Sequence, residues 1–281
     1  MKENISTYEP DNSLKNGYIA IFKEIIAELS QSRWLITQLF KRDFLAMYRQ
    51  TLIGVIWAII IPLISLGTFI ILNQSGIFSV GTISVPYPIY AILGLAFWQL
   101  FATGLIASSN SLVNAGSMIK KINFSKKALV IAAMGQSIVP FLIQIVLLAI
   151  LFIYYQMLPG IAILLIPILA VPIFFLTLGL GFILSILNGI ARDVGNALSV
   201  MITFLMFLTP IFYVRPVSGI LSMITTFNPL YYLVAGSRDI VLTGTFDNPI
   251  GLALAIVLSF VIFFVCLVVF HLTETRVAER I

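Results

Sequence analysis

The sequence predicts an all-α polytopic membrane protein with six transmembrane helices, an N-terminal amphipathic interface helix and two short external re-entrant helices between spans five and six. Three observations predict this fold class: 60% of the 281 residues are hydrophobic, only 10% are charged, and the apolar residues form long uncharged runs. Soluble domains carry about 25% charged residues, so this chain has too few to cover a water-exposed surface. The lone cysteine, Cys266, lies in an apolar run and excludes an intrachain disulfide.

The chain enters the membrane in the stretch from Ser32 to Leu66, whose two halves differ in pattern. In the first half, one helical face is apolar and the opposite face is polar or basic: Ile36, Phe40, Phe44 and Met47 against Gln38, Arg42 and Arg49. This pattern predicts an amphipathic helix over 32–50 that lies on the membrane surface. Charges stop at Thr51, and the run to Leu72 is long enough for a first span, which takes about 20 residues.

Six runs without Asp, Glu, Lys, Arg or His are long enough to be membrane spans, at about 51–72, 89–110, 128–154, 161–187, 197–213 and 250–270. Pro62 in the first span predicts a kink or a local break. Small residues in the second span allow close helix packing: Gly94, Gly104, Ala107 and Ser108. We expect the polar segments 1–31 and 271–281 to lie outside the membrane.

Residues 214–249 are fairly apolar, yet prolines and glycines interrupt them repeatedly. The two apolar pieces, Val217–Phe227 and Leu230–Gly236, are each too short to cross the membrane. We therefore expect two short helices that dip into the membrane edge rather than a seventh span.

Positive charges are distributed unequally between the two sides of this predicted topology. One side holds 14 of the 16 lysines and arginines, and the other side holds only Arg215 and Arg238. This asymmetry predicts that both termini are cytoplasmic. The net charge of +5 then reflects membrane topology, and we expect no nucleic-acid partner. The first 30 residues contain charges and no apolar core of the signal-peptide type.

The residue types argue against several kinds of chemistry. Proton-coupled carriers bury ionisable groups along their path, and the six predicted spans contain none; sodium coupling through backbone carbonyls stays open. His271 and Cys266 cannot assemble a nucleophilic catalytic set, so we expect a capping or interfacial role for His271 and no metal site. The phosphate-binding pattern G-x-x-x-x-G-K-S/T is absent, so any ATP that drives this protein binds to another chain.

Two further features each have a structural and a functional interpretation. The lysines of the 111–127 loop either anchor the topology or dock a partner chain; they are Lys120, Lys121, Lys126 and Lys127. Aromatic residues concentrated near the predicted outer face either form an interfacial belt or line a path for sugars, whose C–H faces suit aromatic rings. The candidates for such a path are Tyr87, Tyr90, Trp98, Phe101, Tyr213, Tyr231 and Tyr232.

Five segments, taken in chain order, form a recognisable set. They are Leu39–Leu63 with Leu52, Gly54, Trp57 and Pro62, Asn114–Leu129, Asn188–Leu198 with Arg192 and Asp193, Thr209–Val214, and Phe227–Gly244. Together they resemble the membrane subunit of ABC-2 type exporters, in the branch that moves O-antigen, capsular polysaccharide or teichoic acid. The resemblance covers about residues 30–275 and makes 51–270 an ABC-2 type transmembrane domain.

This resemblance implies a complex in the bacterial inner membrane. Two copies of this chain would form the pore, and two copies of a separate ATPase subunit would bind ATP and Mg, with no cofactor on this chain. The implied ATPase contacts are Asn114, Met118, Ile119, Lys120, Lys121 and Phe124. The implied substrate is a polyprenyl-diphosphate-linked glycan, whose diphosphate could pair with Arg42 and Arg49. Both arginines could instead bind anionic membrane lipids.

Three alternatives stay open at this point. An ABC-2 exporter of a drug or another lipid would have equally uncharged spans. A membrane-embedded glycolipid enzyme would need acidic or histidine residues near the headgroups, where only the scattered Asp193, Asp239 and Asp247 qualify. A structural scaffold protein is also compatible with the composition.

Overall fold

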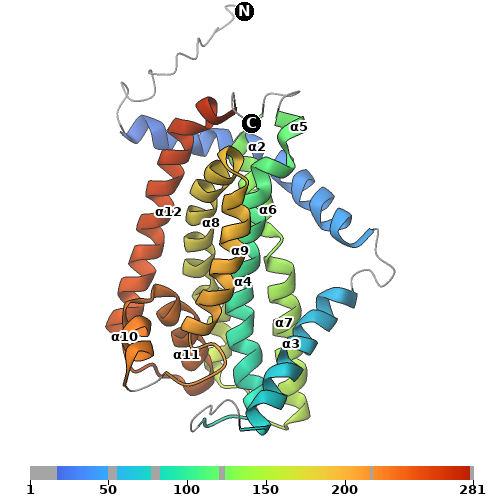
Figure 1. Ribbon diagram of the computed structural model, residues 1–281, viewed down its shortest axis with the longest axis vertical. Helices are drawn as coiled ribbons and strands as arrows, with labels where there is room; N and C mark the ends of the chain where they lie inside the picture. Colours follow the sequence, from blue (N-terminus) through green and yellow to red (C-terminus); the bar gives the residue numbers. More distant parts are fainter. Residues whose placement is uncertain (1–17, 50–55, 77–82, 120–123, 216–217, 279–281) are drawn as a thin grey trace, which may run out of the picture.

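Every regular element among the described residues is helical, which confirms the predicted all-α membrane fold. The computed structural model describes residues 18–49, 56–76, 83–119, 124–215 and 218–278 (Figure 1). Its α-helices are α2 (Tyr18–Arg49), α3 (Trp57–Gln74), α4 (Tyr87–Asn114), α5 (Gly116–Ile119), α6 (Lys126–Gly135), α7 (Ile138–Tyr154), α8 (Ile166–Ile190), α9 (Asp193–Leu208), α10 (Ile220–Phe227), α11 (Ser237–Thr243) and α12 (Pro249–Ala278). A 3₁₀ turn, Ile161–Leu165, leads into α8, and a π-helical segment, Tyr231–Gly236, leads into α11.

Within the described part of the chain, five helical stretches are long and apolar enough to cross a membrane, and they coincide with five of the predicted spans. The remaining predicted span, 197–213, corresponds to the shorter apolar helix α9. This helix begins at Asp193 and ends at Leu208. It ends early because Thr209 has an extended backbone before Pro210, which has no N–H to continue the helix.

The predicted third span is interrupted near its start. Helix α6 ends at Gly135 and α7 begins at Ile138, and the Ser137 hydroxyl between them donates to the carbonyl of Met134 (2.8 Å). Pro140 lies in the first turn of α7, where a missing N–H is tolerated. Helix α3 continues through Pro62, so the expectation of a local break there is wrong, and the expectation of a kink stays a prediction.

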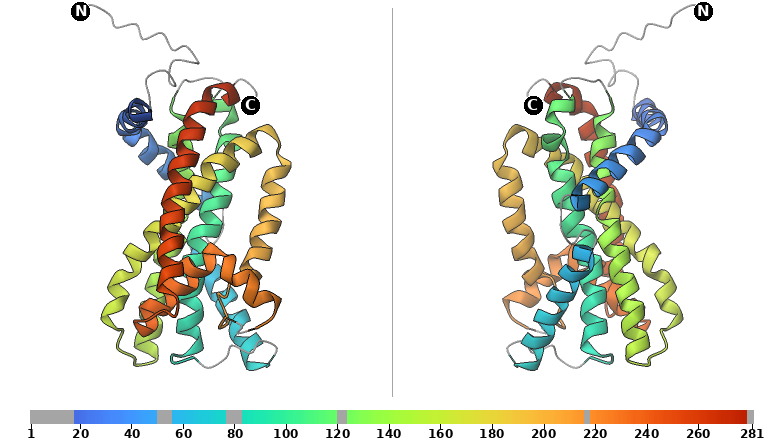
Figure 2. Two further views of the ribbon diagram at one scale, coloured as in Figure 1. Left: turned by 90° about the vertical axis from the view of Figure 1, so that its left-hand side faces the viewer. Right: turned by 90° about the vertical axis from the view of Figure 1, so that its right-hand side faces the viewer.

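The two ends of the bundle are built differently. Helix α2 lies across one end, where α12 also finishes, and we call this the termini end (Figures 1 and 2). The short helices α10 and α11 lie at the opposite end, which we call the far end. They lie alongside the lower parts of the long helices and not beyond the tips of these helices (Figure 1), as re-entrant helices should.

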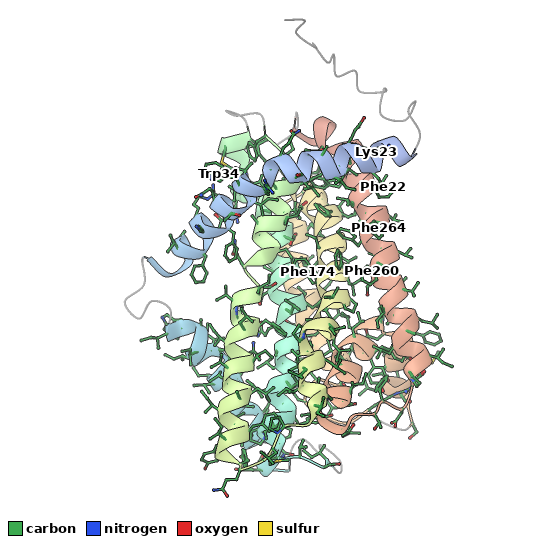
Figure 3. The ribbon with its side chains drawn as sticks, turned by 180° about the vertical axis from the view of Figure 1, so that it is seen from behind. Phe22, Lys23, Trp34, Phe174, Phe260 and Phe264 are labelled. Atoms are coloured by element: carbon green, nitrogen blue, oxygen red, sulfur yellow. The ribbon has the colours of Figure 1, made fainter. Side chains whose placement is uncertain are left out.

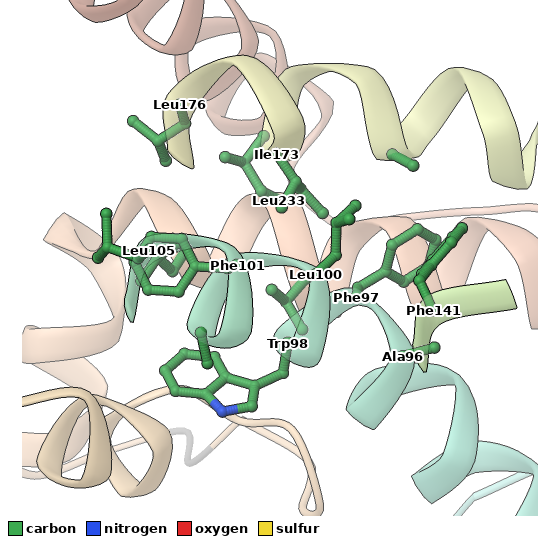
Figure 4. Close-up of a cluster of buried hydrophobic side chains, with 14 of the residues drawn as sticks. Ala96, Phe97, Trp98, Leu100, Phe101, Leu105, Phe141, Ile173, Leu176 and Leu233 are labelled. Atoms are coloured by element: carbon green, nitrogen blue, oxygen red, sulfur yellow. The ribbon is translucent and has the colours of Figure 1, made fainter. Parts of the chain in front are cut away.

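Helix α4 forms the centre of the fold. In its most apolar stretch 83% of the residues are buried, against 22–39% in the four other long helical stretches, so its neighbours surround it. Phe97 of α4 packs against Phe141 of α7 with ring centroids 5.9 Å apart. Leu100 and Phe101 lie on the side of α4 that meets Ile173 of α8 (Figure 4).

Small residues allow α8 to approach two helices closely. A Cβ atom at Gly181 would lie 2.5 Å from Cβ of Ser108 on α4, so Ser108 is one of the close-packing positions that the sequence predicts. A Cβ atom at Gly179 would lie 2.7 Å from Cα of Phe263 on α12. Helix α8 therefore joins α12 to the central helix.

Replacing Gly179 with alanine should weaken the contact between α8 and α12, because the new methyl group would meet backbone atoms that cannot rotate away. Overpacking of this kind costs about 1–3 kcal/mol. We expect a lower midpoint of thermal unfolding in detergent, measured by the loss of monodisperse protein in size-exclusion chromatography. Gly67→Ala in α3 is the matched control, because no atom lies within 4 Å of its Cβ position. Equal losses for both variants would contradict this account of the contact.

Candidate functional site

A buried group of charged side chains joins three helices at the termini end. Lys127, at the start of α6, is fully buried, and its ammonium donates to Oε2 of Glu28 on α2 (2.7 Å) and to Oε1 of Glu274 on α12. His271 lies one turn before Glu274, with Nδ1 3.4 Å from the same Oε1 atom. We call Glu28, Lys127, His271 and Glu274 the ionic cluster.

Sequence reasoning missed this cluster. It treated Lys127 as a topology anchor or a docking residue, whereas the Lys127 ammonium is turned into the protein. It expected a capping or interfacial role for His271, and the structure places this side chain, 13% exposed, beside the carboxylates. The available signal was a lysine directly before an apolar run, together with carboxylates in the helix before the first span and at the end of the last helix. Local patterns do not show that these groups meet.

The cluster has the ligand types of a metal site but not its charge balance. Ligand atoms of Glu28, His271 and Glu274 lie within 4.8 Å of one another. The Lys127 ammonium already contacts both carboxylates, however, and a divalent cation beside it would be repelled. The arrangement therefore fits an internal ion-pair cluster better than a metal centre.

Helix α2 also contacts the interruption between α6 and α7. A Cβ atom at Gly135 would lie 3.1 Å from the ring of Phe40, so this glycine makes room for the ring. Next to it, the Gln136 amide lies 3.5 Å from Oδ2 of Asp43 and donates to it. The break in the predicted third span is thus the place where the second half of α2 rests.

The first half of α2 packs on α12 and leaves its other side open. Phe22 meets the ring of Phe264 edge-on, with centroids 6.0 Å apart (Figure 3). Lys23 points away from the bundle, and the Trp34 side chain is 70% exposed (Figure 3). One face of α2 is buried on the bundle through Ile21, Ile25 and Leu39.

Two residues with different expected roles meet beside α5. Arg42, a candidate for the substrate diphosphate, is exposed, and its Nη1 lies 3.7 Å from Sδ of Met118, a candidate for ATPase contact. The Nε atom of Arg42 donates to Oδ1 of Asp43 (2.7 Å), which compensates part of its charge. Arg49 is the last residue of α2, and its side chain lies outside the described set.

The other proposed ATPase contacts that the structure describes lie at the same end of the bundle. Asn114 is exposed at the end of α4. Met118, Ile119 and Phe124 are half-buried and pack with one side against the core. Lys120 and Lys121 lie outside the described residues.

A buried amide holds the turn between α8 and α9. The Asn188 side chain donates to the Ser109 carbonyl (3.1 Å) and to Oδ1 of Asn110 (2.9 Å), and it accepts from the Gly195 N–H (2.9 Å). These hydrogen bonds connect helix α4 to the start of α9. Arg192, which belongs to the loop motif named in the sequence analysis, is exposed next to these hydrogen bonds.

At the far end a buried arginine joins α11 to two other elements. The Arg238 side chain is 2% exposed, and its Nη1 donates to the carbonyls of Pro210 (2.9 Å) and Ile211 (2.8 Å). Its guanidinium lies 3.7 Å from the ring centroid of Tyr90 on α4, and its Nε donates to Asp239 (2.8 Å). The chain after α9 is thus fixed to α4 and α11 through one side chain.

A cavity of about 450 Å³ opens beside this arginine, and we call it the far-end cavity. Its wall includes Arg215, Arg238, Asp239 and Asp247, so the structure brings together both far-side arginines and two of the three aspartates that looked scattered in the sequence. The remaining lining residues are Ile83, Ser84, Val85, Tyr90, Val214, Tyr231, Leu242, Thr243, Thr245 and Phe246. Asp193 lies at the termini end, at the start of α9.

The aromatic residues proposed for a glycan path are mostly internal to the chain. Six are buried, namely Tyr87, Tyr90, Trp98, Phe101, Tyr231 and Tyr232, and Tyr213 is half-buried. Trp98 and Phe101 belong to the core around α4, with ring centroids 5.6 Å apart (Figure 4). Tyr90 and Tyr231 line the far-end cavity. Within one chain, these aromatics build the centre and the far end of the bundle.

The sequence matches the model of a known protein family. The family model described as ABC-2 type transporter matches residues 35–242, which is most of the chain. The chain belongs to the ABC-2 type transporter family. This result confirms the resemblance inferred from the motif order.

Curated relatives of this ABC-2 family member cover most of its length. An O-antigen export system permease protein RfbA of Klebsiella pneumoniae is 28% identical over 249 residues, which are 87% of this chain and 94% of that protein. A second protein of this name from the same organism is 26% identical over 216 residues, covering 76% and 82% of the two chains. One from Myxococcus xanthus is 24% identical over 222 residues, covering 77% and 83%.

The matched family region contains only part of the ionic cluster. Lys127 lies within residues 35–242, whereas Glu28 and Glu274 lie before and after them. In this ABC-2 family member, segments outside the matched region therefore supply the counter-charges for a lysine inside it. Both arginines of the far-end cavity, in contrast, lie within the matched region.

Replacing Lys127 with methionine should destabilise the junction of α2, α6 and α12, because it leaves two carboxylates without their buried cation. Removing one partner of a buried ion pair costs about 3–5 kcal/mol. Limited proteolysis after solubilisation should release α2 faster from Lys127→Met than from the unchanged protein. Lys126→Met is the neighbouring control, and adding Glu28→Gln and Glu274→Gln to Lys127→Met should restore protection. Unchanged proteolysis of Lys127→Met would show that the cluster does not hold α2.

Proposed function

We propose that this chain is the pore-forming membrane subunit of an ATP-driven exporter that moves a lipid-linked polysaccharide, of O-antigen, capsule or teichoic acid type, across the bacterial inner membrane. The observation that carries the proposal is the near full-length match to a relative named as an O-antigen export permease, over 94% of that relative. The shared family supports transport, and the relatives' names support a glycan substrate.

The sequence chemistry supports a separate source of energy. The predicted spans contain no ionisable residue that could carry coupled protons, and no phosphate-binding loop occurs in the 281 residues. We therefore propose that ATP and Mg bind to an ATP-binding cassette subunit on another chain. The complex would hold two such subunits and two copies of this chain.

We propose that the termini end faces the cytoplasm. The support is the distribution of 14 of the 16 lysines and arginines over segments on that side, because positive charges favour cytoplasmic loops. The far end, with α10, α11 and the far-end cavity, would then face outward. An ATPase on the cytoplasmic side would meet α2, the end of α4 and the 114–124 segment, where the proposed contact residues lie.

Helix α9 supports pairing with a second copy of the chain. Only Leu198 and Ile202 of this helix are buried within the chain, and it stands at the edge of the bundle (Figure 2). Its open face carries the hydroxyls of Ser199 and Thr203, which donate to carbonyls of their own helix and still have free acceptor positions. Polar side chains within membranes usually face protein or water rather than lipid. A second copy would cover this face and enclose a polar path.

The substrate contacts are proposed from charge and ring chemistry. Arg42 and Arg49 would pair with the diphosphate at the headgroup level, in competition with Asp43 for Arg42. Among the proposed path aromatics, Tyr213 is half-buried, and Tyr90 and Tyr231 line the far-end cavity. The other four, Tyr87, Trp98, Phe101 and Tyr232, would reach a glycan only after a rearrangement.

The comparisons with relatives bear differently on two alternative functions that the sequence left open. Export of a drug or another lipid uses the same family and the same uncharged spans, and the relatives' names favour the glycan. A glycolipid enzyme is disfavoured because the relatives are transport permeases and because Asp239, one of its candidate acids, is paired with Arg238.

Purified alone in detergent or nanodiscs, the chain should hydrolyse no ATP above a buffer blank, because it lacks a phosphate-binding loop. Adding the partner ATPase and a polyprenyl-diphosphate-linked glycan in proteoliposomes should give ATP-dependent movement of the glycan across the bilayer. Phosphate release and protection of the glycan from an external glycosidase measure the two activities. ATP turnover by the chain alone, or no glycan movement with the partner present, would overturn the proposal.

Alanine at Met118 and Ile119, or at Lys120 and Lys121, should separate ATP hydrolysis from export if this loop receives force from the ATPase. We expect the complex to assemble and hydrolyse ATP while glycan movement falls at least about tenfold, corresponding to roughly 1.4 kcal/mol of lost coupling. Leu158→Ala, an exposed apolar residue at the far end, is the control. If both loop variants export the glycan normally, the loop does not transmit force and serves only as a topology anchor.

A further inference from the structure

The far-end cavity contains positively charged side chains, which are otherwise absent from this side of the predicted topology. Arg215 and Arg238 are the two basic residues left on the far side by the charge pattern, and both line the same cavity of about 450 Å³. Basic residues are disfavoured on the outer side of membrane proteins, so the presence of two in one cavity calls for a local reason. For Arg238 that reason is structural, because its guanidinium binds the Pro210 and Ile211 carbonyls.

Arg215 contacts α10 through the Ser222 carbonyl and two hydroxyls, but these contacts leave its charge without a counter-ion. Its guanidinium donates to the Thr226 hydroxyl (2.5 Å) and the Thr225 hydroxyl (3.3 Å), and it lies 5.2 Å from the ring centroid of Tyr231. These partners are neutral, and no carboxylate within the described ranges forms an ion pair with Arg215. These hydrogen bonds use the Nε and Nη2 groups, so the Nη1 group of Arg215 retains hydrogen-bonding capacity beside the cavity.

The cavity wall offers donors and acceptors in balance. Its two arginines and two aspartates give a formal charge of zero, and Asp247 is exposed at its rim. Hydroxyls of Ser84, Thr243 and Thr245 add groups that both donate and accept. The rings of Tyr231 and Phe246 add apolar surface, with centroids 5.9 Å apart.

This combination matches one ligand chemistry better than others. Neighbouring hydroxyls of a sugar can each accept from a guanidinium or donate to a carboxylate, and the C–H face of the ring can pack against an aromatic side chain. A neutral wall gives no preference to an anion. The volume lies within the range of roughly 300–1,000 Å³ usual for small-molecule sites.

We propose that the far-end cavity is a binding site for one neutral sugar unit, with Arg215 and Asp247 as hydrogen-bonding groups and Phe246 and Tyr231 as the apolar wall. As a site for the exported glycan, it rests on the proposed function. It lies within one chain at the far end of the bundle. A weak site there would hold the emerging glycan between ATP-driven steps.

Saturation-transfer difference NMR on the full chain in phosphatidylcholine nanodiscs tests the proposal. The probes are the methyl glycosides of glucose, mannose, galactose and rhamnose, with glycerophosphoethanolamine as a zwitterionic lipid-headgroup probe. We expect saturation transfer to at least one glycoside. Arg215→Gln should weaken its binding tenfold or more, as expected for loss of a hydrogen bond from a charged group. Arg192→Gln, an exposed arginine at the other end, should leave binding unchanged.

A second variant keeps the test independent of α10, which Arg215 also holds through Thr225 and Thr226. Ser84→Trp fills the cavity from its exposed rim without removing a charge, and it should abolish transfer to the glycoside. Binding that survives both variants, or transfer to glycerophosphoethanolamine alone, would overturn the sugar site. Glycan export without glycoside binding would refute this site but support the proposed function. Glycoside binding without glycan export would support the site but refute the proposed function.

Discussion

The fold depends on hydrogen bonds to backbone groups at the places where helices end inside an apolar bundle. Pro210 ends α9 before the chain leaves the membrane domain, and the carbonyls of Pro210 and Ile211 lose their helical partners. An unsatisfied carbonyl in hydrocarbon costs several kcal/mol, so a donor must reach it. Arg238 supplies that donor from the other side of the broken segment, and its cation rests on the ring of Tyr90. The far-end helices keep their places because this one guanidinium serves three elements.

The termini end solves related problems with a neutral amide and a buried ion pair. Asn188 uses its carbonyl and amino groups to hold the short turn between α8 and α9 against α4. Lys127 brings α2 and α12 to the start of α6 through two carboxylates. In each case a polar side chain that would be costly to bury alone is buried against groups that hydrogen-bond or neutralise it. The partners come from helices far apart in sequence, so these contacts fix the arrangement of the helices rather than their formation.

Much of the fold could be predicted because its signals are local. Uncharged runs of span length, the asymmetry of lysines and arginines, and the interrupted 214–249 segment depend on neighbouring residues alone. The candidate sites were harder, because Lys127 and Glu274 are 147 residues apart and nothing local indicates that they meet. Trp98 looked like a possible path residue because core, belt and path aromatics share the same spacing, and only packing shows that it is buried. Pro210 lies inside the predicted span 197–213, which followed the uncharged run past this residue. The helix ends at Leu208, two residues before the proline.

These ties also decide which part of the chain can move. Helix α4 is enclosed on nearly all sides, so bending it would disturb the core around Phe97. Helix α9 is tied to α4 at both ends, by Asn188 at the termini end and by Arg238 at the far end, and it buries only two residues between the ties. Within one chain, α9 therefore opens at lower cost than α4, until a second copy covers its open face. The Asn188 tie contacts α4 at Asn110, only four residues before Asn114, where a partner on the termini side would press. The contact between α4 and the start of α9 thus lies about one helical turn from Asn114.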